Sequence, residues 1–189
     1  TYTTGTCVTY CEAGVTGEDD CFEHISQVTV GDDIDNASEC PDETGYSDYT
    51  TQTAEVAIGL ETPISIVNGE PYTADSCGVW VDWNHDGDFD DANESITLNG
   101  QPAGPYTGLI IPPADAITGP TRMRVRITDV AVNPNLDPCG LVVYGETEDY
   151  TLNVSPAPAC PYPGNIVVGD ITVSSAAITW NPVNNAETY

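Results

Sequence analysis

The chain has 189 residues, of which 30 are Asp or Glu and only three are Lys or Arg, so its formal net charge is −27. Nucleic-acid binding requires basic side chains that release counterions from phosphates, and anionic membrane surfaces repel so acidic a protein. The composition therefore argues against nucleic acid and membranes as partners and favours divalent cations. Hydrophobic residues make up 40% of the chain, which is enough for a core, and no apolar run is long enough for membrane insertion.

Seven cysteines occur at irregular spacings without a C-x-x-C pair, and only two histidines could help them bind zinc. A disulfide framework is the better interpretation, and it places the protein in an oxidising compartment, secreted or at the cell surface. The N-terminus has no targeting segment, so we expect an export signal to lie outside this chain. The candidate pairs are Cys21 with Cys40 and Cys77 with Cys139, and the odd count leaves one cysteine over.

The hydrophobic pattern is that of β-strands throughout, with no segment of helical period. Residues 53–60 and 121–128 alternate apolar and polar side chains most clearly. Strands are expected at residues 25–30, 53–60, 64–67, 79–83, 96–98, 107–111, 121–128 and 150–154. Short strands with turn-rich connections predict an all-β fold, a two-sheet antiparallel β-sandwich of jelly-roll or immunoglobulin-like type.

A change of composition divides the chain into a sandwich at residues 1–154, a Pro- and Ala-rich linker at 155–159, and a segment at 160–189 that is too small to fold alone. In this segment, strands are expected at 166–173 and 177–180, the second ending at Trp180, and an Asn-Ala-x-x-Tyr run follows. The pattern resembles the opening of a fibronectin type III module. Its missing strands could be supplied by a longer chain, by the first domain or by a neighbouring subunit.

Residues 80–94 form the sharpest local motif, because oxygen-bearing side chains recur at alternate positions around Gly87. This spacing is typical of calcium loops, although the strand-like entry and a late acidic closing residue distinguish it from an EF-hand. The predicted Ca²⁺ ligands are Asp82, Asn84, Asp86, Asp88 and Glu94, with Asp90 in reserve. The alternative is a solvated acidic turn. Since five Asp carboxylates between residues 82 and 91 repel one another, we expect folding and calcium binding to be linked.

The three basic residues, Arg122, Arg124 and Arg126, occupy alternate positions of one predicted strand, so they share a face. Glu146 and Glu148 alternate in the same way and would complete a cross-strand ion ladder. An anion-binding patch is the functional alternative to this structural ladder.

Four blocks of this sequence together resemble the GEVED domain family, over about residues 10–154. The blocks are residues 45–50 (GYSDYT), 79–84 (VWVDWN) continuing into 86–89 (DGDF), 121–126 (TRMRVR) and 145–150 (GETEDY). The last block is the signature, with Thr147 in place of the usual Val. The resemblance implies a secreted or surface β-sandwich module of multidomain bacterial proteins, without a defined catalytic activity.

The sequence offers no catalytic constellation, because only His24 and His85 could act as a histidine base and no Gly-x-Ser-x-Gly elbow or His-Glu-x-x-His motif occurs. We therefore expect a protein that is not an enzyme.

The first hypothesis is a calcium-stabilised building block of a bacterial surface fibre or adhesin, whose partners are copies of itself or neighbouring β modules, joined through the incomplete C-terminal strands.

The second hypothesis is a carbohydrate-binding accessory module of a secreted hydrolase or peptidase. Tyrosine rings could stack on sugars, and the candidates are Tyr46, Tyr49, Tyr106 and Tyr144. Three Asn-x-Ser sequons, at Asn36, Asn93 and Asn153, are weak indications of a glycoprotein.

Overall fold

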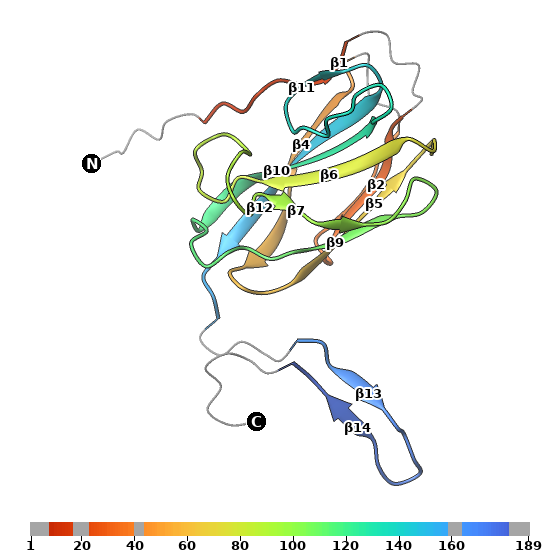
Figure 1. The fold of residues 1–189 in the computed structure, drawn as a ribbon. Coiled ribbons are helices and arrows are strands. Elements are labelled where there is room, and N and C mark those ends of the chain that lie inside the picture. Colours follow the sequence, from red (N-terminus) through yellow and green to blue (C-terminus); the bar gives the residue numbers. More distant parts are fainter. Residues whose placement is uncertain (1–7, 17–22, 40–43, 159–163, 182–189) are drawn as a thin grey trace, which may run out of the picture.

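The computed structural model describes residues 8–16, 23–39, 44–158 and 164–181, and within them it contains strands and no helix. Two five-stranded sheets make up most of this structure (Figure 1). The first has the order β4 (Tyr46–Ala57), β12 (Gly145–Ser155), β10 (Gly119–Asp129), β6 (Asp75–Val81), β7 (Ser95–Ile96). The second has the order β3 (Ile34–Ala37), β2 (Ile25–Val30), β5 (Thr62–Asn68), β9 (Tyr106–Ile110), β8 (Leu98–Asn99). The predicted all-β fold is confirmed, and the two sheets are consistent with a β-sandwich.

The core lies between the two sheets and follows from the alternation along each strand. On β10, Met123, Val125 and Ile127 are fully buried, and they belong to the same core cluster as Val28 of β2 and Ile66 of β5. Successive side chains of a strand point to opposite faces, so burying these residues forces their neighbours onto the outer face of the sheet. The outer face of β10 therefore carries the arginines.

Two strand pairs of this largely antiparallel fold are parallel. Strand β12 pairs in parallel with β4, and a two-stranded parallel pair joins β1 (Ala13–Val15) to β11 (Gly140–Val142). The alternation of buried and exposed side chains is the same in parallel and antiparallel pairs, so the sequence pattern does not distinguish them. The short strands β1, β3 and β11 had no pattern long enough to predict.

Strands β13 (Val167–Gly169) and β14 (Ala177–Thr179) form a separate antiparallel hairpin. Its apolar side chains are exposed, as the exposed fractions of Val168 (54%) and Ile178 (53%) show. These two residues are cross-strand partners. Whether residues 155–159 form a linker between domains stays a prediction, because β12 ends at Ser155 and residues 159–163 lie outside the described part.

Strand β12 begins at a residue whose backbone only glycine adopts easily. Gly145 has a φ of 147°, and a Cβ atom there would lie 2.2 Å from the carbonyl oxygen of Ile127 on β10. The close approach of the two strands therefore requires glycine at this position.

The next even-numbered positions of β12 point two carboxylates toward the second sheet. Glu146 accepts a hydrogen bond from the backbone N–H of Ile25 (2.8 Å), at the start of β2. Glu148 accepts hydrogen bonds from the hydroxyls of Ser38 (2.9 Å) and Tyr150 (2.7 Å). Both carboxylates are buried. They tie the start of β12 to the chain around β2 and β3 through hydrogen bonds.

Burial sets the protonation of Glu148 and predicts how stability changes with pH. Burial raises the pKa of Glu148 to about 7 from an ordinary value of 4.5, although its two hydrogen bonds oppose this rise. Between these two values the folded state binds more protons than the unfolded state, so the free energy of unfolding falls as the pH rises. We expect Glu148→Gln to flatten this dependence between about pH 4.5 and 7, as measured by urea unfolding at a series of pH values. Glu94 titrates with the same sign, so a residual slope is expected, but an unchanged slope would contradict the assignment.

Candidate functional site

The arginine face of β10 is organised by one carboxylate of β12. The antiparallel register places Arg124 opposite Asp149 and Arg126 opposite Thr147. Arg124 donates from Nε to Asp149 Oδ1 (2.8 Å) and from Nη2 to Oδ2 (2.9 Å), and Nη1 of Arg122 donates to Oδ2 of the same carboxylate. Arg126 donates from Nε to the hydroxyl of Thr147 (2.9 Å). One carboxylate therefore serves two guanidinium groups.

The predicted ion ladder between the arginines and Glu146 and Glu148 is wrong. Those two glutamates occupy even positions of β12, and the register pairs the even positions of β10 with odd positions of β12. They consequently face the core, while Thr147 and Asp149 face the arginines. A shift of one residue moves a whole set of side chains to the other face of a sheet. The sequence carried no signal that showed whether the even or the odd positions of β12 face the arginines.

Two of the arginines are almost completely buried, and backbone carbonyls accept most of their remaining hydrogen bonds. Arg124 is 2% exposed and donates from Nη1 to the carbonyls of Cys11 (3.1 Å) and Pro138 (2.9 Å). Arg126 is 1% exposed and donates to the carbonyls of Asp137 (2.7 Å) and Cys139 (3.1 Å). Burial, with help from the neighbouring Arg124 charge, lowers the pKa of Arg126 to about 10. Both side chains fasten loops to the sheet.

A disulfide fastens the same loops. Cys11 pairs with Cys139, with their Cα atoms 5.6 Å apart. The predicted pairing of Cys77 with Cys139 is wrong, because Cys77 lies on β6 opposite Ile127 and points into the core, where it is a free and buried thiol. Burial raises the pKa of this thiol. Cys21 and Cys40 lie outside the described residues.

Residues 8–16, which we call the strap, lie across the arginine face and connect it to the acidic loop at residues 82–94. The Tyr10 ring lies 4.6 Å from the Arg122 guanidinium and stacks on Phe89 with a centroid distance of 5.3 Å. Its hydroxyl donates to Asp82 Oδ2 (2.8 Å). Burial, and next the hydrogen bond with Asp82, raise the pKa of Tyr10.

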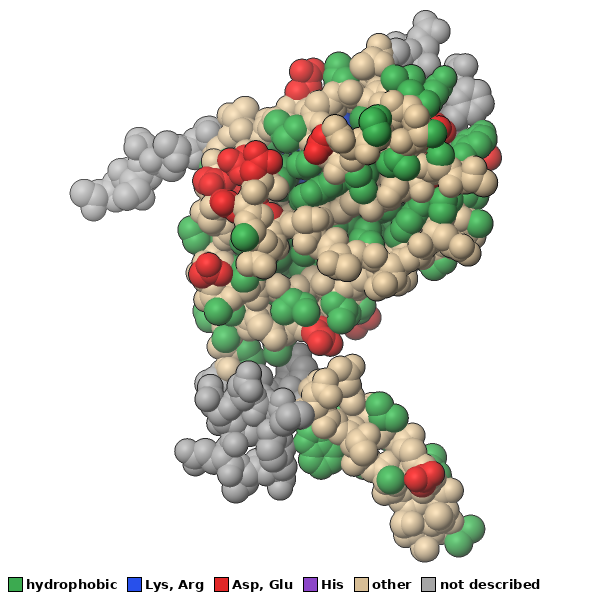
Figure 2. Space-filling model, in the orientation of Figure 1, with side chains coloured by type: hydrophobic (Ala, Val, Ile, Leu, Met, Phe, Trp, Pro, Cys, Tyr) green, Lys and Arg blue, Asp and Glu red, His purple; other side chains and the backbone are tan. Residues whose placement is uncertain are grey.

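The exposed carboxylates of the acidic loop converge on one point. Asp86, Asp88 and Asp91 each offer an oxygen, and these oxygens all lie within 4.8 Å of one another. Asn84 donates from Nδ2 to Asp86 (2.8 Å) and to Asp91 (2.6 Å). Figure 2 shows acidic side chains gathered at the loop between β6 and β7. The sequence pattern missed Asp91 because it breaks the alternate spacing.

The two other predicted ligands are buried and hold the backbone of the loop. Asp82 is fully buried and, besides Tyr10, accepts hydrogen bonds from the N–H groups of Asp86 (3.2 Å) and Gly87 (3.1 Å). Glu94 is 1% exposed and accepts from the N–H groups of Trp83 (3.1 Å) and Asp91 (3.2 Å). Burial raises the pKa of Glu94 to about 7. The reserve ligand, Asp90, lies outside the carboxylate cluster and donates its N–H to Asp88 (3.0 Å).

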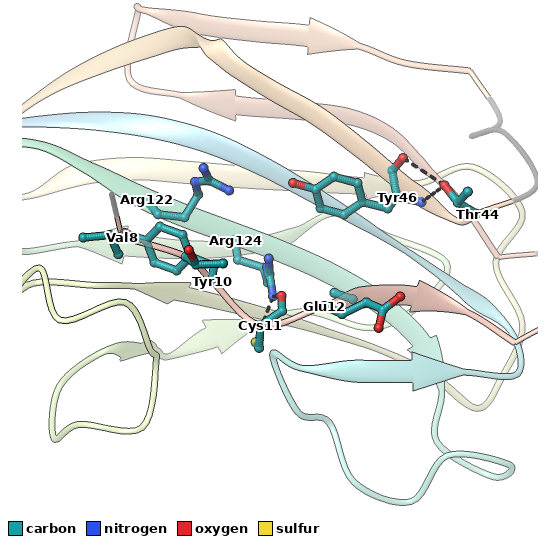
Figure 3. A pocket seen from close by; sticks show the side chains of 10 residues that line it. Val8, Tyr10, Cys11, Glu12, Thr44, Tyr46, Arg122 and Arg124 are labelled. Carbon is teal, nitrogen blue, oxygen red and sulfur yellow. Dashed lines mark hydrogen bonds between the residues drawn. The ribbon is translucent and has the colours of Figure 1, made fainter. Parts of the chain in front are cut away.

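A groove of about 470 Å³ lies between the strap and the start of β4 (Figure 3). Arg122 and Arg124 line it, together with strap residues and Tyr46, whose hydroxyl donates to Asp149 (2.9 Å). Burial, and next the nearby Asp149 charge, raise the pKa of Tyr46 to about 12.

The other tyrosines named as carbohydrate candidates have different surroundings. Tyr106 is in the core and donates to the carbonyl of Asp75 (3.0 Å), and Tyr49 stacks on Tyr150 with a centroid distance of 5.6 Å. Tyr144 is 38% exposed but does not line the groove.

The sequon asparagines also differ in their surroundings. Asn36 donates to the Tyr150 hydroxyl (2.8 Å) and Asn153 donates to Glu55, whereas Asn93 is exposed. Glycosylation itself stays a prediction at all three sites.

Residues 76–153 match the family model of the GEVED domain. The matched segment begins in β6 and ends in β12, so it includes the acidic loop, the arginine face and the signature block. The block at residues 45–50 lies outside it. No curated protein matches the chain. The described part of the chain holds no helix long and apolar enough to cross a membrane.

Asp149 is the residue whose replacement should cost most stability at this face. Asp149→Asn leaves the buried Arg124 guanidinium without a countercharge, and breaking a buried ion pair in this way costs about 3–5 kcal/mol. We expect a fall of this order in the free energy of unfolding, measured by urea denaturation. The same change at the exposed Asp115 is the control and should alter stability by less than about 0.5 kcal/mol. Equal effects of the two changes would contradict a central role for Asp149.

Proposed function

We propose that the protein is a non-enzymatic, calcium-stabilised β-sandwich module of a secreted or surface-exposed bacterial protein, and that it serves as a building block of a fibre or adhesin. The observation that carries this proposal is the convergence of Asp86, Asp88 and Asp91 in the acidic loop. The GEVED match supports the module, and the Cys11–Cys139 disulfide supports an oxidising location.

The distances between the carboxylates suit a calcium ion. Ca²⁺ binds six to eight oxygens at about 2.3–2.6 Å, so two oxygens on one ion lie at most about 5 Å apart. The oxygens of Asp86, Asp88 and Asp91 already meet this limit, and water can complete the shell because all three residues are exposed. Without a cation, three carboxylates at this spacing repel one another.

The anchoring of the loop makes calcium a structural rather than a catalytic ligand in this proposal. Asp82 and Glu94 hold the two ends of the loop next to β6 and β7, and Tyr10 connects Asp82 to the strap. An ion bound to the exposed carboxylates would therefore stabilise both the loop and the strap packed on it. Binding only to the folded state adds its free energy to the stability of the fold.

The environments of the reactive side chains support a non-enzymatic role. The free thiol of Cys77 is buried in the core, where its raised pKa keeps it protonated. His24 packs over Gly69, and His85 sits in the acidic loop with a φ of 59°. None of these side chains lines the groove beside the arginines.

The β13–β14 hairpin supports assembly with a second copy of the chain. A two-stranded hairpin is marginal in water by itself, and this one exposes Val168 and Ile178. We propose that these strands, which resemble the start of a fibronectin type III module, are covered by a neighbouring copy, so that successive subunits join into a fibre.

Calcium should stabilise the protein through the converging carboxylates. At a free concentration 100 times the Kd, a ligand adds about 2.7 kcal/mol to the stability of the folded state. We expect calcium to raise the Tm, a chelator to lower it, and the double variant Asp88→Asn with Asp91→Asn to lose the response. The control is Asp32→Asn, an exposed residue of the β2–β3 turn, which should respond like the parent chain. A Tm that ignores both calcium and chelator would refute the calcium part of the proposal.

Assembly should depend on the apolar face of the hairpin. We expect the parent chain to form oligomers or filaments in light scattering and negative-stain electron microscopy. Val168→Asp with Ile178→Asp should leave monomers with an unchanged Tm of the sandwich, because the cross-strand pair is exposed. Asn165→Asp adds negative charge to the same segment without removing apolar surface, and it should assemble normally. A parent chain that stays monomeric at high concentration would refute the fibre.

A further inference from the structure

Arg122 differs from the two other arginines in having unused hydrogen-bonding capacity. Its side chain is 23% exposed, whereas that of Arg124 is 2% exposed. Within the described part of the chain, only Nη1 of Arg122 takes part in a hydrogen bond, with Asp149, while all three guanidinium nitrogens of Arg124 do. Arg122 also lines the groove between the strap and β4. Nε and Nη2 are therefore available to a ligand.

The position of this guanidinium is fixed before any ligand arrives. The Tyr10 ring lies against it at 4.6 Å, and Asp149 holds Nη1. Asp149 is shared with Arg124, so two positive charges at the base of the groove face one carboxylate between them. An oriented guanidinium with two free N–H donors is the arrangement that binds a carboxylate in a fork. The chain as a whole has a net charge of −27 and repels anions. A groove that favours an anion is therefore unusual in this protein.

The other walls of the groove determine which carboxylate fits. Figure 3 shows Arg122 beside Tyr10, with Tyr46 across the groove and Glu12 farther along the strap. The Tyr46 ring suits the apolar face of a sugar, and Glu12 and Thr9 suit its hydroxyl groups. The charge of Glu12 repels ligands that carry more than one negative charge, which disfavours phosphates and polyacidic peptides.

We propose that this groove binds a sugar that carries one carboxylate, a hexuronic acid residue of an acidic glycan, with the carboxylate on Arg122 and the sugar ring against Tyr46. This role is additional to the structural one, and the residues that line the groove lie outside the acidic loop. It gives a chemical identity to the carbohydrate ligand of the second sequence-based hypothesis.

Titration calorimetry with a galactotriose that carries a single galacturonic acid residue, and with neutral galactotriose, tests the proposal. The acidic trisaccharide should bind at least tenfold more tightly than the neutral one. Arg122→Gln should weaken its binding at least tenfold, and Arg122→Lys, which keeps the charge but not the fork, should give an intermediate loss. Gln101→Glu lowers the net charge by the same amount at an exposed turn, and should bind like the parent chain. Melting curves establish whether each variant is folded. If Arg122→Gln does not fold, the affinity of Arg122→Lys decides the test.

Several results would overturn the proposal. Equal affinity for the two trisaccharides, or no binding, would remove the carboxylate from the recognition. Equal weakening by Gln101→Glu would indicate long-range charge rather than a site. A peptide that binds better as its free acid than as its amide, and better than the sugar, would assign the groove to peptide termini. Binding that needs calcium and survives Arg122→Gln would place the sugar on an ion of the acidic loop, which would leave the calcium proposal standing.

Discussion

The sharing of the Asp149 carboxylate by Arg122 and Arg124 is the interaction on which the outer face of this protein depends. All three basic residues of the chain stand on one face of the central strand β10. Burying guanidinium groups is costly unless each finds partners, and one carboxylate cannot satisfy three of them. Backbone carbonyls of residues 137–140 and of Cys11 accept the remaining hydrogen bonds. The arginine hydrogen bonds that Asp149 cannot accept therefore fasten the strap and the loop before β11 to the sheet.

The alternation of side chains along β12 explains the residue types of the signature block at the start of this strand. Gly145 allows β12 to approach β10 closely, the glutamates at 146 and 148 point inward, and Asp149 points outward. The inward carboxylates bind the region of β2 and β3, while the outward one binds the arginines. Six consecutive residues thus connect both sheets and the strap, which explains why acidic side chains occur there in the middle of a folded domain. Each of these carboxylates connects separate parts of the structure through hydrogen bonds.

Sequence patterns predicted the features that depend on periodicity and missed those that depend on pairing. Alternation gave the all-β fold, the main strands and the common face of the arginines, because burial imposes that period. The partner of the arginines was wrong by one residue, since the parity of β10 against β12 is set by the register and not by either strand alone. The Cys11–Cys139 pair joins residues 128 positions apart, and no local pattern carries such a contact. In the acidic loop, the spacing identified Asp86 and Asp88 but separated Asp91 from them, because the turn, and not the spacing, brings it back.

Tyr10 joins the two proposed sites through a single side chain. Its ring supports Arg122 at the groove, and its hydroxyl donates to Asp82 at the base of the acidic loop. Both contacts are made by a strap that the disulfide and β1 hold in place, so the ring has little freedom to adjust. The hydroxyl and the ring belong to one rigid group, so the hydrogen bond to Asp82 and the contact with Arg122 constrain the same side chain. The strap side of the groove and the base of the acidic loop are therefore held by the same tyrosine.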